Sequence, residues 1–189
     1  MKLAILFPGI GYNNDKPLLY YSGKLFKSHE FEVVKIEYSN LPSDVFSNKD
    51  SFNKCLDLVY EQTCNQLKKI DFASLNGDDD LIFFVGKSIG TVAAARYAKE
   101  NNLTVGQIIL TPLKQTIDYL EDGCNLVFHG DDDRWADSDE INMLCAMKHI
   151  ETFTIPDANH SLEVGDIGED IDNLNEIISL IENYISDYE

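Results

Sequence analysis

The stretch LIFFVGKSIGTVAAARYA at positions 81–98 decides the fold. Its first five residues are apolar, which predicts a buried strand, and its last eight favour a helix. The chain must turn sharply between them. A serine at such a turn is lifted above the sheet edge in a strained backbone conformation, and the positions two residues away must be small because strand and helix approach closely. Gly86 and Gly90 meet this requirement, so Ser88 is a candidate nucleophile.

A second interpretation of this turn is the end of a phosphate-binding loop, Gly86-Lys87-Ser88. Such a loop requires a glycine five residues before Gly86, but Leu81 stands there, inside the expected strand. Composition argues the same way, because 33 acidic and 15 basic residues give a formal net charge of −18. A surface this negative repels phosphate groups, so neither nucleic acid nor an anionic membrane is an expected partner.

Apolar runs of strand length recur along the chain, separated mostly by segments with helical spacing. They cover residues 3–7, 33–38, 81–85, 107–110, 125–129 and 152–155. This alternation predicts an α/β protein, a three-layer sandwich in which helices cover both faces of a six-stranded parallel sheet.

Two longer helices are expected from apolar stripes, one around residues 52–70 and one that closes the chain. The stripe of the closing helix consists of Ile171, Leu174, Ile178, Ile181 and Ile185. No repeat, low-complexity segment or Gly/Ser/Pro linker divides the chain, so residues 1–189 are expected to form a single domain.

The N-terminal apolar run ends at Pro8 and is too short for a signal peptide or a membrane span. The four cysteines lack the close pairs of zinc sites and disulfide frameworks. They are Cys55, Cys64, Cys124 and Cys145. We therefore expect reduced thiols and a cytoplasmic location. The acidic clusters have no histidine or cysteine partners at ligand spacing, so neither a metal nor a cofactor is expected.

A serine hydroxyl needs a base, and the chain has four histidines. Active sites of parallel sheets lie outside the carboxyl ends of the strands. His29 and His149 each precede a predicted strand and so lie at the wrong edge. His129 ends a strand but precedes the acidic cluster, and we expect it to be a structural hydrogen-bonding group. His160 follows the last strand in a turn-rich loop and is the candidate base.

Residues 128–136, Phe-His-Gly-Asp-Asp-Asp-Arg-Trp-Ala, resemble the His-Gly-x-x-Asp segment that supplies the acid in α/β-hydrolases. The pair Asn159-His160, with Ser-Leu-Glu after it, is similar to the histidine loop of small dienelactone-hydrolase-like members. The likeness extends over roughly residues 1–163. It implies a minimal α/β-hydrolase fold with Asp133 as the acid, in the chain order Ser, Asp, His. Asp131 and Asp132 are then expected to be solvated loop carboxylates.

The resemblance also implies an oxyanion hole made of two backbone amides. One belongs to Ile89, after the nucleophile, and the other to Ile10, in the turn after the first strand, with Gly9 as the alternative. The implied strand order is second, first, third, fourth, fifth, sixth. No segment between the later strands is long enough for a cap domain, so the site should be open and shallow. Pro8-Gly9 replaces the His-Gly of lipases and the cysteine nucleophile of dienelactone hydrolases is absent, so neither substrate class carries over.

Tyr12, Leu113 and Trp135 each adjoin the carboxyl end of a strand and are the expected substrate-binding residues, although local packing would also explain them. Nearby carboxylates disfavour anionic substrates. The expected function is therefore that of a serine hydrolase for small neutral esters or thioesters. Acyl transfer to an acceptor other than water, and a binding protein that kept the fold without the chemistry, are the alternatives. The oligomeric state does not follow from these patterns.

Overall fold

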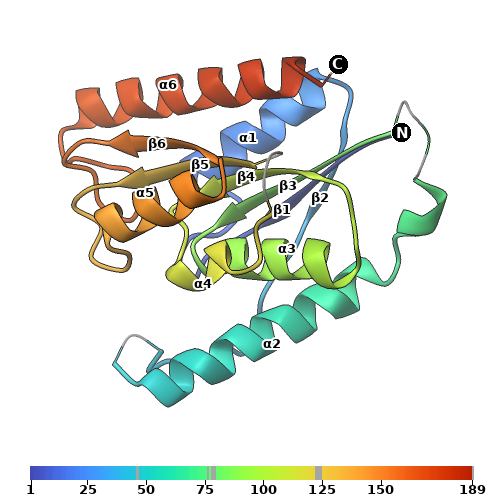
Figure 1. The fold of residues 1–189 in the computed structure, drawn as a ribbon, viewed down its shortest axis with the longest axis horizontal. Helices are drawn as coiled ribbons and strands as arrows, with labels where there is room; N and C mark the ends of the chain where they lie inside the picture. The colour runs from blue at the N-terminus through green and yellow to red at the C-terminus, as the bar shows by residue number, and fades with distance from the viewer. Residues whose placement is uncertain (46, 76, 78–79, 122–124, 189) are drawn as a thin grey trace.

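The computed structural model describes residues 1–45, 47–75, 77, 80–121 and 125–188, and its strands form one sheet (Figure 1). They are β1 (Lys2–Phe7), β2 (Glu32–Lys35), β3 (Leu81–Lys87), β4 (Gly106–Leu110), β5 (Asn125–Gly130) and β6 (Glu151–Ile155). All neighbouring strands are parallel, and their spatial order is β2-β1-β3-β4-β5-β6. The expected six-stranded parallel sheet and its strand order are confirmed.

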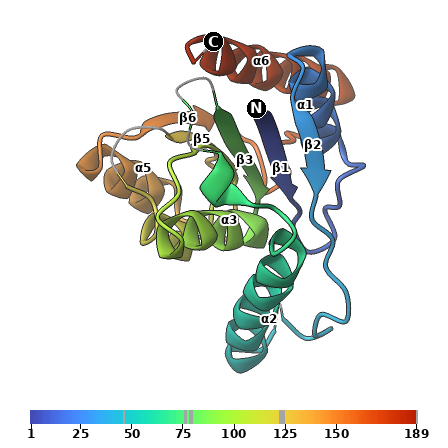
Figure 2. The same cartoon turned by 90° about the vertical axis from the view of Figure 1, so that its right-hand side faces the viewer.

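Helices cover both faces of this sheet (Figures 1 and 2). One face carries α1 (Pro17–Ser28) and α6 (Ile167–Ser186). The other carries α2 (Lys49–Leu67), α3 (Ile89–Glu100), α4 (Lys114–Ile117) and α5 (Ser138–Met147), and a 3₁₀ turn, η1 (Phe72–Ser74), precedes β3. These layers confirm the α/β three-layer sandwich.

The central strand β3 is buried on both sides. Phe83 and Val85 belong to the core beneath α1 and α6, whereas Ile82 and Phe84 belong to the core beneath α2 and α3. Because helices cover both faces, a central parallel strand must be apolar at successive positions and cannot alternate with polar residues. The turn at Ser88 therefore follows a strand that is buried from Ile82 to its last residue, Lys87.

The edge strand β2 is shorter than the apolar run at 33–38 predicts. After Ile36, whose amide donates to the carbonyl of Leu6 at 2.9 Å, the backbone leaves β1 and pairs with side chains of α2. The amides of Glu37 and Ser39 donate to the side-chain oxygens of Gln66 and Gln62, at 3.0 and 2.9 Å. The amide nitrogens of both glutamines donate back to the carbonyls of the same two residues. Two glutamines thus replace the sheet ladder, so the strand ends at Lys35.

The buried face of α6 also differs from the predicted stripe at its start. Ile177, Ile181 and Ile185 are fully buried, but Ile171 is 60% exposed. In Figure 1, α1 lies beneath the later turns of α6, and the first turns project beyond it. The prediction for Ile171 was therefore wrong, because the apolar spacing continues where no partner helix covers it.

Three of the cysteines, Cys55, Cys64 and Cys145, are free thiols, and the first and last are buried. Cys124 lies outside the described residues. No helix in the described ranges is long and apolar enough to cross a membrane.

Candidate active site

Ser88 occupies the tight turn between β3 and α3. Its backbone has φ 55° and ψ −124°, a conformation that side chains rarely adopt and that is strained for any residue except glycine. A Cβ on Gly86 would lie 2.7 Å from the Cα of Thr91, and a Cβ on Gly90 would overlap the carbonyl oxygens of Phe7 and Pro8. Both glycines are needed for the close approach of strand and helix that the sequence indicates.

Replacing Gly90 by alanine should lower the free energy of unfolding by about 2 kcal/mol, because the obstructing atoms belong to the backbone of Phe7 and Pro8, at the end of β1, and cannot rotate away. Gly168→Ala is the matched control. Gly168 is also the second residue of its helix, and the nearest atom to an added Cβ is a carboxylate oxygen of Asp166, at 3.2 Å. Urea unfolding of both variants measures the difference. Equal losses would show that the contact with β1 is not what requires glycine.

The three candidate catalytic side chains lie in hydrogen-bond contact at the carboxyl edge of the sheet. The Ser88 hydroxyl is 2.8 Å from Nε2 of His160, and Nδ1 of the same ring is 2.7 Å from Oδ2 of Asp133. The other oxygen, Oδ1, accepts the backbone amide of Trp135 at 2.8 Å. The Asp133 side chain is fully buried, whereas that of His160 is 21% exposed. The buried carboxylate of Asp133 thus contacts one nitrogen of the His160 ring, and the other ring nitrogen contacts the Ser88 hydroxyl.

The neighbouring carboxylates do not compete for the imidazole. Asp131 Oδ1 accepts the backbone amide of Asp157 at 2.5 Å and so holds the start of the histidine loop. Asp132 is exposed, and Asp139 is exposed in the first turn of α5. Gly130 leaves space for the backbone of Ala158, which a Cβ there would overlap. The geometry thus selects Asp133 from the acidic run.

Burial is the main cause that lowers the pKa of His160 below its ordinary value of 6.5, and the Lys87 ammonium adds to it. The hydrogen bond and the charge of Asp133 act in the opposite direction. The net direction keeps the imidazole neutral at pH 7, which is the form able to accept a proton from serine.

Two backbone amides beside Ser88 could stabilise an oxyanion. Ile89 is the first residue of α3, so its N–H has no acceptor within the helix and lies at the positive end of the helix dipole. In the turn after β1, the Gly9 amide already donates to the carbonyl of Tyr12 at 2.9 Å. A Cβ on Gly9 would lie 3.1 Å from Cβ of Ser88, so this turn touches the nucleophile. Because the Gly9 amide is already engaged, the amide of Ile10, the next residue, remains the candidate for the second donor.

Two of the three expected substrate-binding residues border hollows, and one of these hollows includes His160. Trp135 is 49% exposed, and its ring centroid is 6.4 Å from that of His160. It lines a hollow of about 350 Å³ that includes His160, and a groove of about 520 Å³ that includes Leu113. The remaining apolar lining of the groove comes from Val45, Phe52, Ala136 and Ile141.

Tyr12 does not lie at the mouth of the site, so that expectation was wrong. The side chain is buried, and its hydroxyl accepts the backbone amide of Leu18 at 3.1 Å. Its ring centroid lies 4.9 Å from Nζ of Lys87, the residue before Ser88. The sequence does not predict these contacts of Lys87, because the Gly-x-Ser-x-Gly motif accepts any residue at its position. The pattern that could have indicated them is a charged residue at the end of a strand that is otherwise apolar and almost wholly buried.

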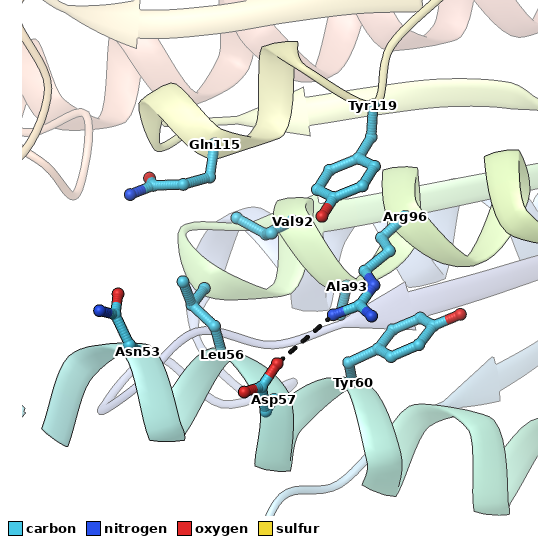
Figure 3. A pocket seen from close by; sticks show the side chains of 9 residues that line it. All are labelled: Asn53, Leu56, Asp57, Tyr60, Val92, Ala93, Arg96, Gln115 and Tyr119. Atoms are coloured by element: carbon cyan, nitrogen blue, oxygen red, sulfur yellow. Dashed lines mark ion pairs between the residues drawn. The ribbon is translucent and has the colours of Figure 1, made fainter. Parts of the chain in front are cut away.

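Another hollow, of about 260 Å³, lies between α2 and α3 (Figure 3). Arg96 on its wall stacks over the ring of Tyr60 at 3.9 Å and pairs with Glu100 at 2.8 Å and Asp57 at 3.6 Å. Two carboxylates thus already balance its charge, and the lining includes no residue of the triad. We therefore place the candidate reaction at Ser88. Within the described ranges, no group of three or more His, Cys, Asp or Glu side chains could hold a metal ion.

No protein-family model and no curated protein matches this sequence. Solved structures do match its fold. Est1E from Butyrivibrio proteoclasticus with bound ferulic acid has a TM-score of 0.67 at 13% identity, covering 98% of this chain and 90% of that one. An esterase from Pyrococcus furiosus has a TM-score of 0.65 at 12% identity, and the match covers 98% of this chain and 82% of that one. An α/β serine hydrolase without a lid, from Xanthomonas campestris, has a TM-score of 0.63 at 16% identity, and the match covers 98% of this chain and 81% of that one. The chain thus has the α/β-hydrolase fold in its small, lidless form, with no cap domain over the described residues.

Proposed function

We propose that this protein is a serine hydrolase that cleaves small, neutral esters or thioesters through an acyl-enzyme on Ser88. One observation carries the proposal: the hydrogen-bonded series Ser88, His160 and Asp133, with distances of 2.8 and 2.7 Å, at a strained strand-to-helix turn. Each contact joins the atoms that a nucleophile, a base and an orienting acid require.

The chemistry divides into two displacements. In the first, Oγ of Ser88 bonds to the substrate carbonyl carbon while its proton passes to Nε2 of His160. The tetrahedral intermediate then collapses, and the alcohol or thiol leaves with the proton from the imidazolium. In the second, water adds to the acyl-serine, again giving a proton to Nε2, and the acid departs as the hydroxyl of Ser88 is restored. Asp133 stabilises the transient imidazolium without taking its proton.

The developing negative charge on the carbonyl oxygen needs donors that are already in place. The amides of Ile89 and Ile10 border the Ser88 turn and supply this role in the proposal, because backbone donors need not reorient during the reaction. No metal and no cofactor takes part in these steps.

The substrate class follows from the groove and its charges. Trp135 and Leu113 offer an apolar surface. The charged residues of the same groove balance one another, because Lys49 and Lys114 line it together with Asp137 and Glu140, and Lys114 pairs with Glu140 at 2.5 Å. The net charge of −18 on the whole chain disfavours a negatively charged substrate. A small uncharged acyl group and a neutral leaving group fit best. The bound ferulic acid in Est1E belongs to that protein, but a carboxylic acid is also the product class expected here.

A fluorophosphonate probe tests this function directly. The folded protein should be labelled once, at Ser88, and Ser88→Ala should remain unlabelled. A series of p-nitrophenyl esters and thioesters of increasing chain length then identifies the preferred acyl group, and added alcohols or amines reveal any acyl transfer in the products. A folded protein that reacts with neither probe nor ester would contradict the proposal and favour the alternative of a binding protein.

The proposal includes a cytoplasmic location, without nucleic acid or membrane partners. Cys55 and Cys145 are buried free thiols, as suits a reducing compartment. Fractionation of cells that make the protein would test this location. Recovery with the membranes, or from an oxidising compartment outside the cytoplasm, would contradict it.

A further inference from the structure

Lys87 is a buried cation that the proposed mechanism does not use. It is the last residue of β3, directly before Ser88, and only 1% of its surface is exposed. Lysine is almost never fully buried without partners, because removing the ammonium from water is costly. A motif that accepts any residue at this position does not explain a lysine there.

The Lys87 ammonium joins three parts of the site. Nζ donates to Oγ1 of Thr111, just after β4, at 2.5 Å, and to the backbone carbonyl of His160 at 2.7 Å. Thr111 is fully buried with φ 49°, and its amide donates to the carbonyl of Phe128 in β5 at 2.7 Å. A threonine held in this strained conformation presents its hydroxyl to Lys87 from a fixed point on the sheet.

The histidine loop has other ties, but they act on the residues around His160. Asp131 holds the amide of Asp157, and the carbonyl of Glu163 accepts the amide of Asn159 at 2.9 Å. The contact from Lys87 is made to the backbone of His160 itself. It therefore ties the backbone of His160 to the end of β3, directly before Ser88.

We propose that Lys87 is a positioning residue, an inference that rests on the proposed function: it binds the carbonyl of His160 to the ends of β3 and β4 and thereby holds Nε2 in line with Oγ of Ser88. Reaction geometry is sensitive to such support, since a displacement of about 1 Å can cost about 100-fold in rate.

The charge of Lys87 adds a second, separable effect. The ionisable groups that face it are Asp133, Glu163, His160 and Tyr12. Burial lowers the pKa of Lys87 to about 7, against the opposing attraction of Asp133 and Glu163, and burial raises the pKa of Tyr12 to about 12. An ammonium has three N–H donors and a neutral amine two, so both acceptors are served in either state. While protonated, Lys87 also lowers the pKa of His160.

Lys87→Met tests both effects because methionine keeps an unbranched side chain as far as Cε and removes Nζ with its donors and its charge. We expect kcat for a p-nitrophenyl ester to fall on the order of 10- to 100-fold with little change in KM. The acid limb of kcat/KM should move to higher pH, because His160 loses a repelling cation and its pKa rises. Lys99→Met is the matched control: Lys99 donates to the carbonyl of Asp118 at 2.9 Å, on the surface, and its loss should leave kcat and the acid limb unchanged.

A Lys87→Met protein with wild-type kcat and an unmoved acid limb would overturn the inference, whereas a wild-type protein that hydrolyses nothing and resists the fluorophosphonate would overturn the proposed function instead. Titration of the His160 ring by NMR gives the pKa shift without any turnover. If Lys87→Met does not fold, Lys87→Gln takes its place. The glutamine amide is neutral and keeps an NH₂ group that can donate, so a smaller loss in kcat with the same direction of pH shift is expected, and no change in either would again overturn the inference.

Discussion

Ser88→Ala is expected to lower ester turnover on the order of 10⁴- to 10⁶-fold, and His160→Ala by a similar factor. Alanine at 88 leaves no atom to form the acyl-enzyme. Alanine at 160 removes the Nε2 atom that lies 2.8 Å from the Ser88 hydroxyl, so the serine has no base to take its proton. Since nucleophile and base act in one step, the double variant should be hardly slower than either single variant. Steady-state kinetics on the three proteins measures this non-additivity.

The controls for this cycle come from residues of the same type outside the triad. Ser161 follows the base directly, and Ser161→Ala should keep turnover close to wild type. His149 lies before β6, at the opposite edge of the sheet, with φ 54°, which asparagine tolerates. His149→Asn should therefore keep both activity and fold. Losses that multiply in the double variant would indicate that Ser88 and His160 act separately, and the triad would be wrong.

Much of the fold could be predicted from local sequence because the strands are buried on both faces. A run such as residues 81–85, with Phe83 packed on one core and Phe84 on the other, leaves a continuous apolar signal. The edges of the molecule gave weaker signals. β2 ends early because Gln62 and Gln66, 23 and 29 residues further on, take over its backbone hydrogen bonds. Such long-range side-chain partners leave no local pattern.

The triad contacts were foreseeable because parallel strands bring their carboxyl ends to one edge, where Ser88, Asp133 and His160 all lie. The burial of Tyr12 and the contacts of Lys87 were not foreseeable. Both side chains depend on contacts across several strand ends, since Nζ of Lys87 reaches a threonine 24 residues away and a carbonyl 73 residues away. A buried polar network is specified by three-dimensional geometry, and the sequence alone offers only the oddity of a lysine in a core strand.

Asp133→Asn should lower turnover on the order of 10⁴-fold, although the substitution changes almost no volume. Oδ1 accepts the Trp135 amide at 2.8 Å, and this contact fixes which way an asparagine would sit. Its carbonyl oxygen would keep the Trp135 amide, so its NH₂ group would face Nδ1 of His160. Nδ1 must then accept a hydrogen bond, which moves the ring proton to Nε2. A protonated Nε2 cannot take the proton of Ser88, so the wrong tautomer abolishes the base.

The adjacent Asp132→Asn is the matched control. Asp132 is exposed, and its substitution removes the same charge one residue away from Asp133. Its kcat should stay near wild type, whereas Asp133→Asn should lose activity with its thermal unfolding little changed. The tautomer itself can be read from the ring nitrogen shifts of His160 by NMR, which should exchange their protonated and unprotonated positions in Asp133→Asn alone. If Asp132→Asn lost as much activity, bulk charge near the site would be the cause. If Asp133→Asn lost less than about tenfold, the carboxylate would not be orienting the base, and the acid assignment would fail even with Ser88 and His160 intact.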